Sequence, residues 1–165
     1  MRDGLIVRDF AAGDVVPAND LTNHYIRETA IHFGAAPASD HAFAALWEKG
    51  RAGFPWLAAE REGRFAGYCK AGVWRERDAY ARTVETGVYV ARDAQGRGVG
   101  RALYEALLAR LRDAGFHAAV AGITLPNDAS VRLHESVGFT RVGVFREVGR
   151  KFDAWHDVGF WQVVL

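Results

Sequence analysis

Three glycines at alternate positions open the most regular helical pattern of the chain, and two arginines lie among them. Gly96, Gly98 and Gly100 are interleaved with Arg97 and Arg101 in the run QGRGVGRALYEALLARLRDAG. The start of a helix presents unpaired backbone N–H groups and the positive end of the helix dipole, and glycine has no Cβ to keep a ligand away. The loop therefore predicts a site for phosphate oxygens, to which both arginines would add charge-assisted hydrogen bonds. A helix start that needs glycine for its turn geometry alone is the alternative.

Two other phosphate-binding glycine loops fit this run poorly. A dinucleotide fingerprint is G-x-G-x-x-G after the first strand of a βαβ unit, with an acidic residue about 20 residues later. Here the spacing is G-x-G-x-G, the loop lies past the middle of the chain, and the following segment HAAVAGITL ends without Asp or Glu. A nucleoside-triphosphate loop fits even less well, because no Gly-Lys-Ser/Thr ending is present.

The other reactive side chains do not indicate a metal centre or a cysteine nucleophile. The six histidines show no H-x-x-x-H or H-E-x-x-H grouping, so zinc has no local framework and we expect no metal. Cys69 is the only cysteine, which excludes an intrachain disulfide, and it lies in an apolar run without an apparent histidine partner. We expect this cysteine to be a small buried side chain.

The chain is half hydrophobic and almost neutral. Its 165 residues fit one globular domain, residues 1–165. With 21 basic and 20 acidic residues the net charge is +1, so no overall field favours nucleic acid or an anionic membrane as a partner. No run approaches the roughly 20 apolar residues of a membrane span, and the N-terminus lacks the apolar core of a signal peptide. We expect a soluble, cytoplasmic protein whose anion site is local.

The hydrophobic periodicity predicts the strands and helices that position these groups. A helix follows the glycine loop and ends near Gly115, because Leu103, Leu107 and Leu111 recur at helical spacing. Gly87 interrupts the strand before the loop and indicates a β-bulge there. Together the elements predict an α/β fold, a central mixed sheet with helices on both faces. Strands are expected at residues 5–7, 56–61, 64–75, 83–91, 117–125, 139–149 and 156–165, and helices at 15–28 (in one or two pieces), 40–48, 99–115 and 126–138.

The glycine loop and its surroundings resemble those of a known enzyme superfamily. The pattern Q-x-x-G-x-G, here Gln95, Gly98 and Gly100, is similar to the pyrophosphate loop of the GNAT N-acetyltransferases. The runs WRERDAYARTVETGVYVARDAQGRGVGRALY, GITLPNDASVRLHESVGF and WHDVGFW resemble, in this order, the phosphinothricin acetyltransferase family. The N-terminal part matches more loosely, through NHYIRETAIHF. This resemblance implies the GNAT fold, with a mostly antiparallel, twisted sheet of about six to seven strands.

The resemblance also implies an activity and its cosubstrate. Such enzymes transfer an acetyl group from acetyl-coenzyme A (acetyl-CoA) to an amine, without a metal. We therefore expect an N-acetyltransferase in which the α-amine of phosphinothricin, methionine sulfoximine or a similar amino-acid analogue attacks directly, and we expect a homodimer. The positions matched to cosubstrate binding are Val88, Tyr89, Val90, Gln95, Gly96, Arg97, Gly98, Val99, Gly100, Arg101, Asn127 and Ser130.

Two side chains match catalytic positions of the family. An alkyl amine is almost fully protonated at neutral pH and must lose a proton before it attacks, so a base is required. Glu85 lies at the matched position for that base, acting directly or through water; an exposed strand carboxylate in a surface ion pair is the alternative. His134 would donate a proton to the departing thiolate or order water beside the amine, and otherwise it is a packing residue. Asn127 can instead serve as the cap of the helix that carries His134.

The segment before the Glu85 strand is rich in arginine, which suits binding of a carboxylate or phosphinate. Arg75 matches a basic position of the family, so an amino-acid-like substrate fits. The residues expected to contact this substrate are Phe33, Arg75, Tyr80 and Arg82, with Arg77 as a further candidate. A solvated, charged hairpin is the alternative for at least two of the arginines.

Two other functions share these features. A coenzyme A-responsive module would hold acetyl-CoA without turning it over, although the presence of Glu85 and His134 argues against it. Acetylation of protein N-termini or lysines uses the same chemistry. A groove lined by acidic residues would suit such substrates better than an arginine-rich approach.

Overall fold

A seven-stranded sheet forms the centre of the protein, described for residues 4–165 by a computed structural model. The strands follow the order β1-β2-β3-β4-β5-β7-β6, and each neighbouring pair is antiparallel except β4 with β5. The strands are β1 (Leu5–Asp9), β2 (Trp56–Arg61), β3 (Arg64–Val73), β4 (Thr83–Val90), β5 (Ala118–Leu125), β6 (Thr140–Lys151) and β7 (Ala154–Val164), and the helices are α1 (Val15–Glu28), α2 (Asp40–Arg51), α3 (Val99–Asp113) and α4 (Asp128–Ser136). The predicted α/β class and the mixed, mostly antiparallel sheet are confirmed.

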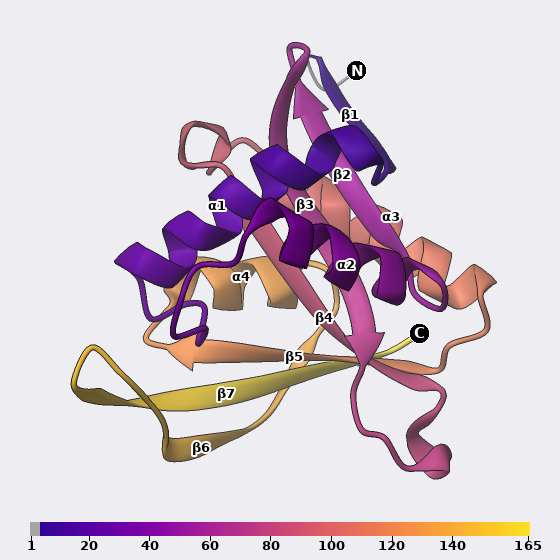
Figure 1. Cartoon of the computed structure of the whole chain (residues 1–165). Helices are drawn as coiled ribbons and strands as arrows, with labels where there is room; N and C mark the ends of the chain where they lie inside the picture. The colour runs from indigo at the N-terminus through magenta and orange to yellow at the C-terminus, as the bar shows by residue number, and fades with distance from the viewer. Residues whose placement is uncertain (1–3) are drawn as a thin grey trace.

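The helices cover both faces of the sheet, because successive side chains of a strand point to opposite sides. On β3, Tyr68 packs in one apolar cluster with Phe10 and with Trp47 of α2. The adjacent Cys69 packs in the other cluster, with Leu103 of α3. Figure 1 shows α1 and α2 in front of the sheet and α3 behind it. The prediction of helices on both faces is confirmed.

Local sequence accounts for where the elements begin and turn. Ser39 caps α2, its side-chain oxygen accepting the Ala42 N–H at 3.2 Å. α1 is one continuous helix, since Pro17 lies in its first turn, where no intrahelical N–H is lost. Glu62 and Gly63 turn the β2–β3 hairpin with φ of 53° and 74°.

The parallel pair β4–β5 is short, and this opens the sheet. Residues 83–85 of β4 pair with residues 118–120 of β5, after which β5 continues beside β7 and β4 beside β3. β4 pairs with β3 in unbroken register through Gly87, so the β-bulge predicted there is wrong. The backbone of residues 86–90 is released on one side by the departure of β5, not by a bulge (Figure 1).

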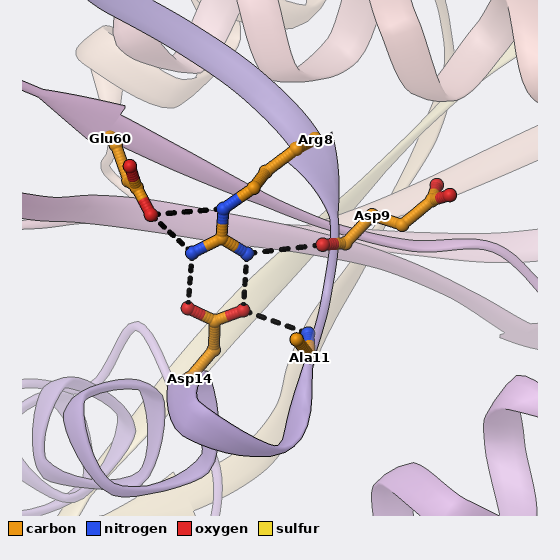
Figure 2. A network of polar contacts seen from close by, with 5 residues as sticks. All are labelled: Arg8, Asp9, Ala11, Asp14 and Glu60. Atoms are coloured by element: carbon orange, nitrogen blue, oxygen red, sulfur yellow. Dashed lines mark hydrogen bonds and ion pairs between the residues drawn. The ribbon is translucent and has the colours of Figure 1, made fainter.

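A network of charged groups ties the edge strand β1 to the start of α1 and to β2. The Arg8 guanidinium donates to both carboxylate oxygens of Asp14, at 2.6 and 2.8 Å, and through Nε to Glu60 at 2.9 Å (Figure 2). A further N–H bonds the Asp9 carbonyl oxygen at 3.1 Å, and Asp14 also accepts the Ala11 N–H at 2.8 Å. The hydrogen bonds from Asp14 and Glu60 raise the pKa of Arg8, because they favour its charged form. This edge of the sheet is therefore held by charges that satisfy one another.

Two kinds of feature are absent from the part of the chain that the structure describes. Among residues 4–165, no helix is long and apolar enough to cross a membrane. In the same range, no group of three or more His, Cys, Asp or Glu side chains is arranged to hold a metal ion. Cys69 is free and fully buried, and burial raises the pKa of its thiol, so its reactive thiolate is disfavoured.

Candidate active site

The split between β4 and β5 opens into a cavity of about 510 Å³. This volume lies within the range of small-molecule sites. Residues from both faces of the sheet meet in its wall, because the cavity passes through the gap between the strands. The lining includes residues 70–73 of β3, 85–89 of β4 and 122–124 of β5, together with Leu46, Trp56, Tyr104, Asn127, Ser130 and His134.

The glycine loop begins α3 with an open, uncapped helix end. Gly96 and Gly98 have φ of 70° and 82°, a left-handed conformation that favours glycine. Apart from the adjacent residues in sequence, no atom of the described chain lies within 4 Å of a Cβ built on either residue, so a ligand can approach the loop closely. Gly98 is the N-cap of α3 and has no side chain to bond the first N–H groups of the helix. At Gly100, by contrast, a Cβ would lie 2.9 Å from Leu133 Cδ2, so this glycine serves the packing of α3 against α4.

The polar residues of the loop have different environments. Arg97 is exposed. Arg101 is half exposed and forms an ion pair with Glu105, one turn later in α3, at 2.7 Å. Gln95 donates to the Tyr25 hydroxyl at 2.9 Å, and this hydroxyl donates to the Val90 carbonyl oxygen at 2.9 Å. Gln95 thus ties the end of β4 to α1, and the loop lies beyond the lining of the cavity.

A buried chain of hydrogen bonds leads from α4 to α3 in the cavity wall. His134 is 4% exposed, with Nδ1 2.7 Å from the Ser130 carbonyl oxygen and Nε2 2.7 Å from the Tyr104 hydroxyl. A carbonyl oxygen can only accept, so Nδ1 carries the proton and the Tyr104 hydroxyl donates to Nε2. Burial lowers the pKa of His134 and raises that of Tyr104, so both side chains are neutral at pH 7.

Glu85 and Lys70 form a charged part of the cavity wall on the α1/α2 side of the sheet. Lys70 pairs with Gly87 and Glu85 with Gly72, so the two side chains are diagonal neighbours on one face. They are too far apart for an ion pair, but each acts on the other's pKa. Burial lowers the pKa of Lys70, and the Glu85 charge opposes this effect. Although Glu85 is open to solvent, loss of part of its hydration raises its pKa, while Lys70 and Arg75 act in the opposite direction.

The residues predicted to bind the cosubstrate are divided between the cavity and its surroundings. Val88, Tyr89, Asn127 and Ser130 line the cavity, and Val99 is buried in the core below the loop. Burial raises the pKa of Tyr89 to about 12. The Asn127 side chain accepts the Ser130 N–H at 3.1 Å, so it also caps α4.

Arg75 is the predicted substrate residue with a clear connection to the cavity. Its charge acts on Glu85, and its guanidinium lies over the Trp74 ring, 4.8 Å from the centroid. It is exposed, as is Arg77 in the loop that follows β3. An exposed guanidinium beside Glu85 remains available to a substrate carboxylate.

The other residues predicted to contact substrate, like Arg75 itself, lie outside the lining of this cavity. Arg82 donates to the Gly115 carbonyl oxygen at 3.2 Å, at the turn between α3 and β5. Tyr80 is 42% exposed in a short turn after β3. Phe33 packs on Gly149 of β6, where a Cβ would overlap its ring at 2.2 Å.

Two residues of the cavity escaped sequence-based prediction of the site. Tyr104 belongs to the apolar stripe of α3, but a buried tyrosine hydroxyl requires a hydrogen-bond partner, and here it finds His134. Lys70 is the one charge in the run FAGYCKAGV, which is otherwise free of charged residues. A lone charge within a buried strand is costly and was the available signal.

Comparison with known proteins defines the class. The acetyltransferase (GNAT) family matches residues 19–139, a range that includes the glycine loop, the β4–β5 split and α4. The chain belongs to this family and is an N-acetyltransferase. The family membership and the enzyme class predicted from the sequence are confirmed.

Particular relatives match nearly the whole chain. A phosphinothricin N-acetyltransferase of Streptomyces viridochromogenes is 44% identical over 156 residues, which cover 94% of this chain and 85% of the relative. An L-methionine sulfoximine/L-methionine sulfone acetyltransferase of Salmonella typhimurium is 36% identical over 162 residues, 98% of this chain and 95% of the relative. The solved structure of a phosphinothricin acetyltransferase from Sinorhizobium meliloti in complex with acetyl-CoA has a TM-score of 0.94 at 29% identity, covering 98% of this chain and 89% of that one.

Proposed function

We propose that this chain acetylates the α-amine of a small amino-acid analogue, such as phosphinothricin or methionine sulfoximine, with acetyl-CoA as the second substrate. The observation that carries the proposal is the position of Glu85, a carboxylate in the wall of the cavity where β4 and β5 separate. The substrate class comes from the relatives, one named for phosphinothricin and another for methionine sulfoximine and sulfone. Arg75, whose charge acts on Glu85, suits the α-carboxylate of such compounds.

The described residues fit acetyl-CoA at two places. The open helix end at Gly96 and Gly98, with Arg97 and Arg101 beside it, would hold the diphosphate. The backbone of residues 86–90, which is unpaired towards β5, would bond the pantetheine arm and the thioester oxygen. Held in this way, the thioester supplies an activated acetyl group near Glu85.

Glu85 acts as the general base in this proposal. Its carboxylate attracts the ammonium form of the substrate and takes up a proton, directly or through one water molecule. The raised pKa of Glu85 makes it a stronger base than an ordinary carboxylate. The neutral amine then attacks the thioester carbonyl carbon directly; the new C–N bond replaces the C–S bond, without an acetyl-enzyme.

In this proposal the Tyr104 hydroxyl turns from His134 Nε2 to the departing thiolate and gives it a proton, and the second proton of the attacking nitrogen restores the hydroxyl. His134 holds the Tyr104 hydroxyl through the 2.7 Å bond to Nε2, so the hydroxyl has a fixed place in the cavity wall. The ammonium group loses two protons as it becomes an amide. One is balanced by the proton that the thiolate receives, and the other passes from Glu85 to solvent.

An amine panel tests this function. Release of free thiol from acetyl-CoA is measured with phosphinothricin, methionine sulfoximine, ordinary amino acids and a lysine peptide. We expect the highest kcat/KM with the first two compounds. Release with the peptide alone would instead indicate acetylation of protein amines, and binding of acetyl-CoA in calorimetry without release for any amine would indicate a binding module.

We also propose a cytoplasmic homodimer in which each chain is a single domain. Acetyl-CoA is an intracellular metabolite, which supports the compartment. Large apolar side chains of the β6–β7 hairpin support self-association, since Val142, Phe145, Val148, Phe152 and Trp155 are each 55–64% exposed. Light scattering after size exclusion tests the dimer, and a monomer at assay concentration would reject it.

A further inference from the structure

Lys70 is a partly buried charge that the described chain leaves without a hydrogen bond. It lies in the wall of the 510 Å³ cavity, and among residues 4–165 no oxygen is within hydrogen-bonding distance of its ammonium. Burial lowers its pKa, which reflects the cost of keeping this charge in the protein. A buried ammonium is stabilised when an anion and hydrogen-bond acceptors accompany it. Lys70 therefore lines a cavity in which a ligand could supply the hydrogen-bond acceptor that residues 4–165 do not.

Trp56 holds the ammonium at a defined place. The Lys70 Nζ lies 4.9 Å from the centroid of the Trp56 ring, within the range of a cation–π contact. The ring is 5% exposed and is packed edge-on against Phe10 and Phe43 and stacked on Tyr68, with centroid distances of 5.7, 6.1 and 6.1 Å. A fixed ring under a long side chain limits its rotamers, so the charge is positioned before a ligand arrives.

Two cations flank Glu85 along β3. Glu85 faces Gly72, while Lys70 precedes that residue and Arg75 follows it. Both positive charges act on the Glu85 carboxylate. His32, on which Lys70 also acts, accepts the Gly34 N–H at Nδ1 and has a pKa lowered chiefly by burial, so it adds no charge at neutral pH. A substrate amine at Glu85 is thus accompanied by two cations that act on the same carboxylate.

Phosphinothricin carries two anions that match this arrangement. Its carboxylate is on the carbon that bears the amine, and its phosphinate is separated from the nitrogen by three carbon atoms. Methionine sulfone has the same carbon chain and the same tetrahedral, methyl-bearing end group, but its sulfone is neutral. The two compounds therefore differ at this end by one negative charge and hardly at all in shape.

We propose that Lys70 is a specificity-determining residue that binds the anionic side-chain group of the substrate, so that this chain prefers phosphinothricin to methionine sulfone. The inference rests on the proposed function and deepens it. Relatives over the same length are named for each of the two compound types, so the shared fold does not decide between them. The charge of Lys70 does distinguish them, because it attracts the phosphinate and not the neutral sulfone.

The test compares the wild type, Lys70→Met and Lys70→Arg with both compounds as substrates. Lys70→Met keeps an unbranched side chain over Trp56 and removes the charge. We expect it to raise KM for phosphinothricin by about 10- to 100-fold, the range of a lost charge-assisted hydrogen bond, with little change in kcat. KM for methionine sulfone should change by less than about threefold, and Lys70→Arg should keep the preference for phosphinothricin. Rates are taken on the plateau above the acidic limb and below the pH at which Lys70 loses its proton, because loss of Lys70 also affects the ionisation of Glu85.

Lys49→Met is the matched control. Lys49 is exposed on α2 at the rim of the same cavity, and its charge does not act on Glu85. This variant should keep the wild-type ratio of the two KM values, and thermal unfolding should show that all variants are folded. An equal loss with both compounds, or no loss with either, would overturn the role of Lys70. If the wild type acetylates neither compound while still binding acetyl-CoA, the proposed function fails, and this inference fails with it.

Discussion

The Arg8 cluster at the edge of the sheet and the Glu85–Lys70 cluster in the cavity both combine acidic and basic side chains. Among the described residues, only the charges of the Arg8 cluster are paired with one another. Arg8 donates to Asp14, Glu60 and the Asp9 carbonyl oxygen (Figure 2). Within the described residues, Glu85 and Lys70 form neither an ion pair nor a hydrogen bond. The pKa values differ in the same way: partners strengthen the charged state of Arg8, whereas partial loss of hydration weakens the charged states of Glu85 and Lys70.

This difference separates charges that stabilise the fold from charges that are ready to react or bind. A satisfied network lowers the free energy of the folded state, and a substrate has nothing to add to it. A carboxylate or ammonium that is partly dehydrated and unpartnered costs free energy, which a bound amine or anion can recover. Replacing one carboxylate by its amide in each cluster should therefore have opposite consequences for activity and stability.

Glu85→Gln should have the largest effect on catalysis. We expect turnover at neutral pH to fall by about 10²- to 10⁴-fold, because the amide cannot accept the amine proton. Affinity for acetyl-CoA, measured by calorimetry, should stay near normal. Turnover that is unchanged across the pH range would exclude Glu85 as the base. It would also contradict the view that the cavity cluster, unlike the Arg8 cluster, serves catalysis.

The stability of this variant provides the second readout. The pKa of Glu85 is raised in the folded state, so the stability that the group contributes is present below its unfolded pKa and is lost as the pH rises through its folded pKa. At pH 8 the wild type therefore carries the cost of an ionised Glu85. Glu85→Gln should have the same Tm as the wild type or a slightly higher one.

Asp14→Asn is the matched substitution in the Arg8 cluster. Asp14 is 4% exposed and accepts bonds from Arg8 and from the Ala11 N–H. Loss of its charge should lower the free energy of unfolding by about 2 kcal/mol, moderated by the partial exposure of Arg8. Denaturant unfolding measures this change, and kcat/KM should stay within about twofold of the wild type because the cluster lies outside the cavity. A loss of activity without a loss of stability would contradict the distinction between the two clusters.

The sequence predicted those parts of the site that depend on local backbone structure. The glycine loop was recognised because alternate glycines before the apolar repeat of Leu103, Leu107 and Leu111 require a helix that begins there. Glu85 was found through its family motif, and the same strand alternation that places it on the α1/α2 face also places Lys70 there. The pairing of β3 with β4, which makes them neighbours, is a long-range contact that periodicity does not contain.

The wrong prediction of a bulge, and the different surroundings of neighbouring arginines, also depend on contacts that are distant in sequence. Gly87 indicated a bulge, but the backbone is released by the departure of β5 towards β7, which depends on strand order. The arginines after β3 were grouped because they are close in sequence. In three dimensions the charge of Arg75 acts on Glu85, while Arg82, just before β4, bonds the Gly115 carbonyl oxygen.

Gly98→Ala extends the comparison to the glycine loop, a second place where the described residues leave polar groups without partners. Alanine at φ of 82° is strained by about 1–2 kcal/mol, although no atom of the described chain blocks its Cβ. The variant should lose about that much stability, and the added methyl group should weaken acetyl-CoA binding beyond the strain alone. Gly13→Ala is the control, since its Cβ is equally free and its φ is not left-handed. Equal acetyl-CoA affinity for both variants would place the diphosphate away from the loop.

The smallest expected effect is a shift in the pH dependence of the reaction. Activity requires ionised Glu85, so it is present above the pKa of this group and is lost as the pH falls through it. Lys70 lowers that pKa, although burial raises it more. Lys70→Met should therefore move the acidic limb of kcat/KM to higher pH.

Methionine sulfone is the substrate for this measurement, because its neutral end group makes no use of Lys70 and its amine titrates identically with both enzymes. A limb that does not move would show that the titrating group is not Glu85 or that Lys70 does not act on it. A limb that moves while KM for the sulfone stays constant would separate the electrostatic influence of Lys70 on the base from its role in binding the anionic substrate.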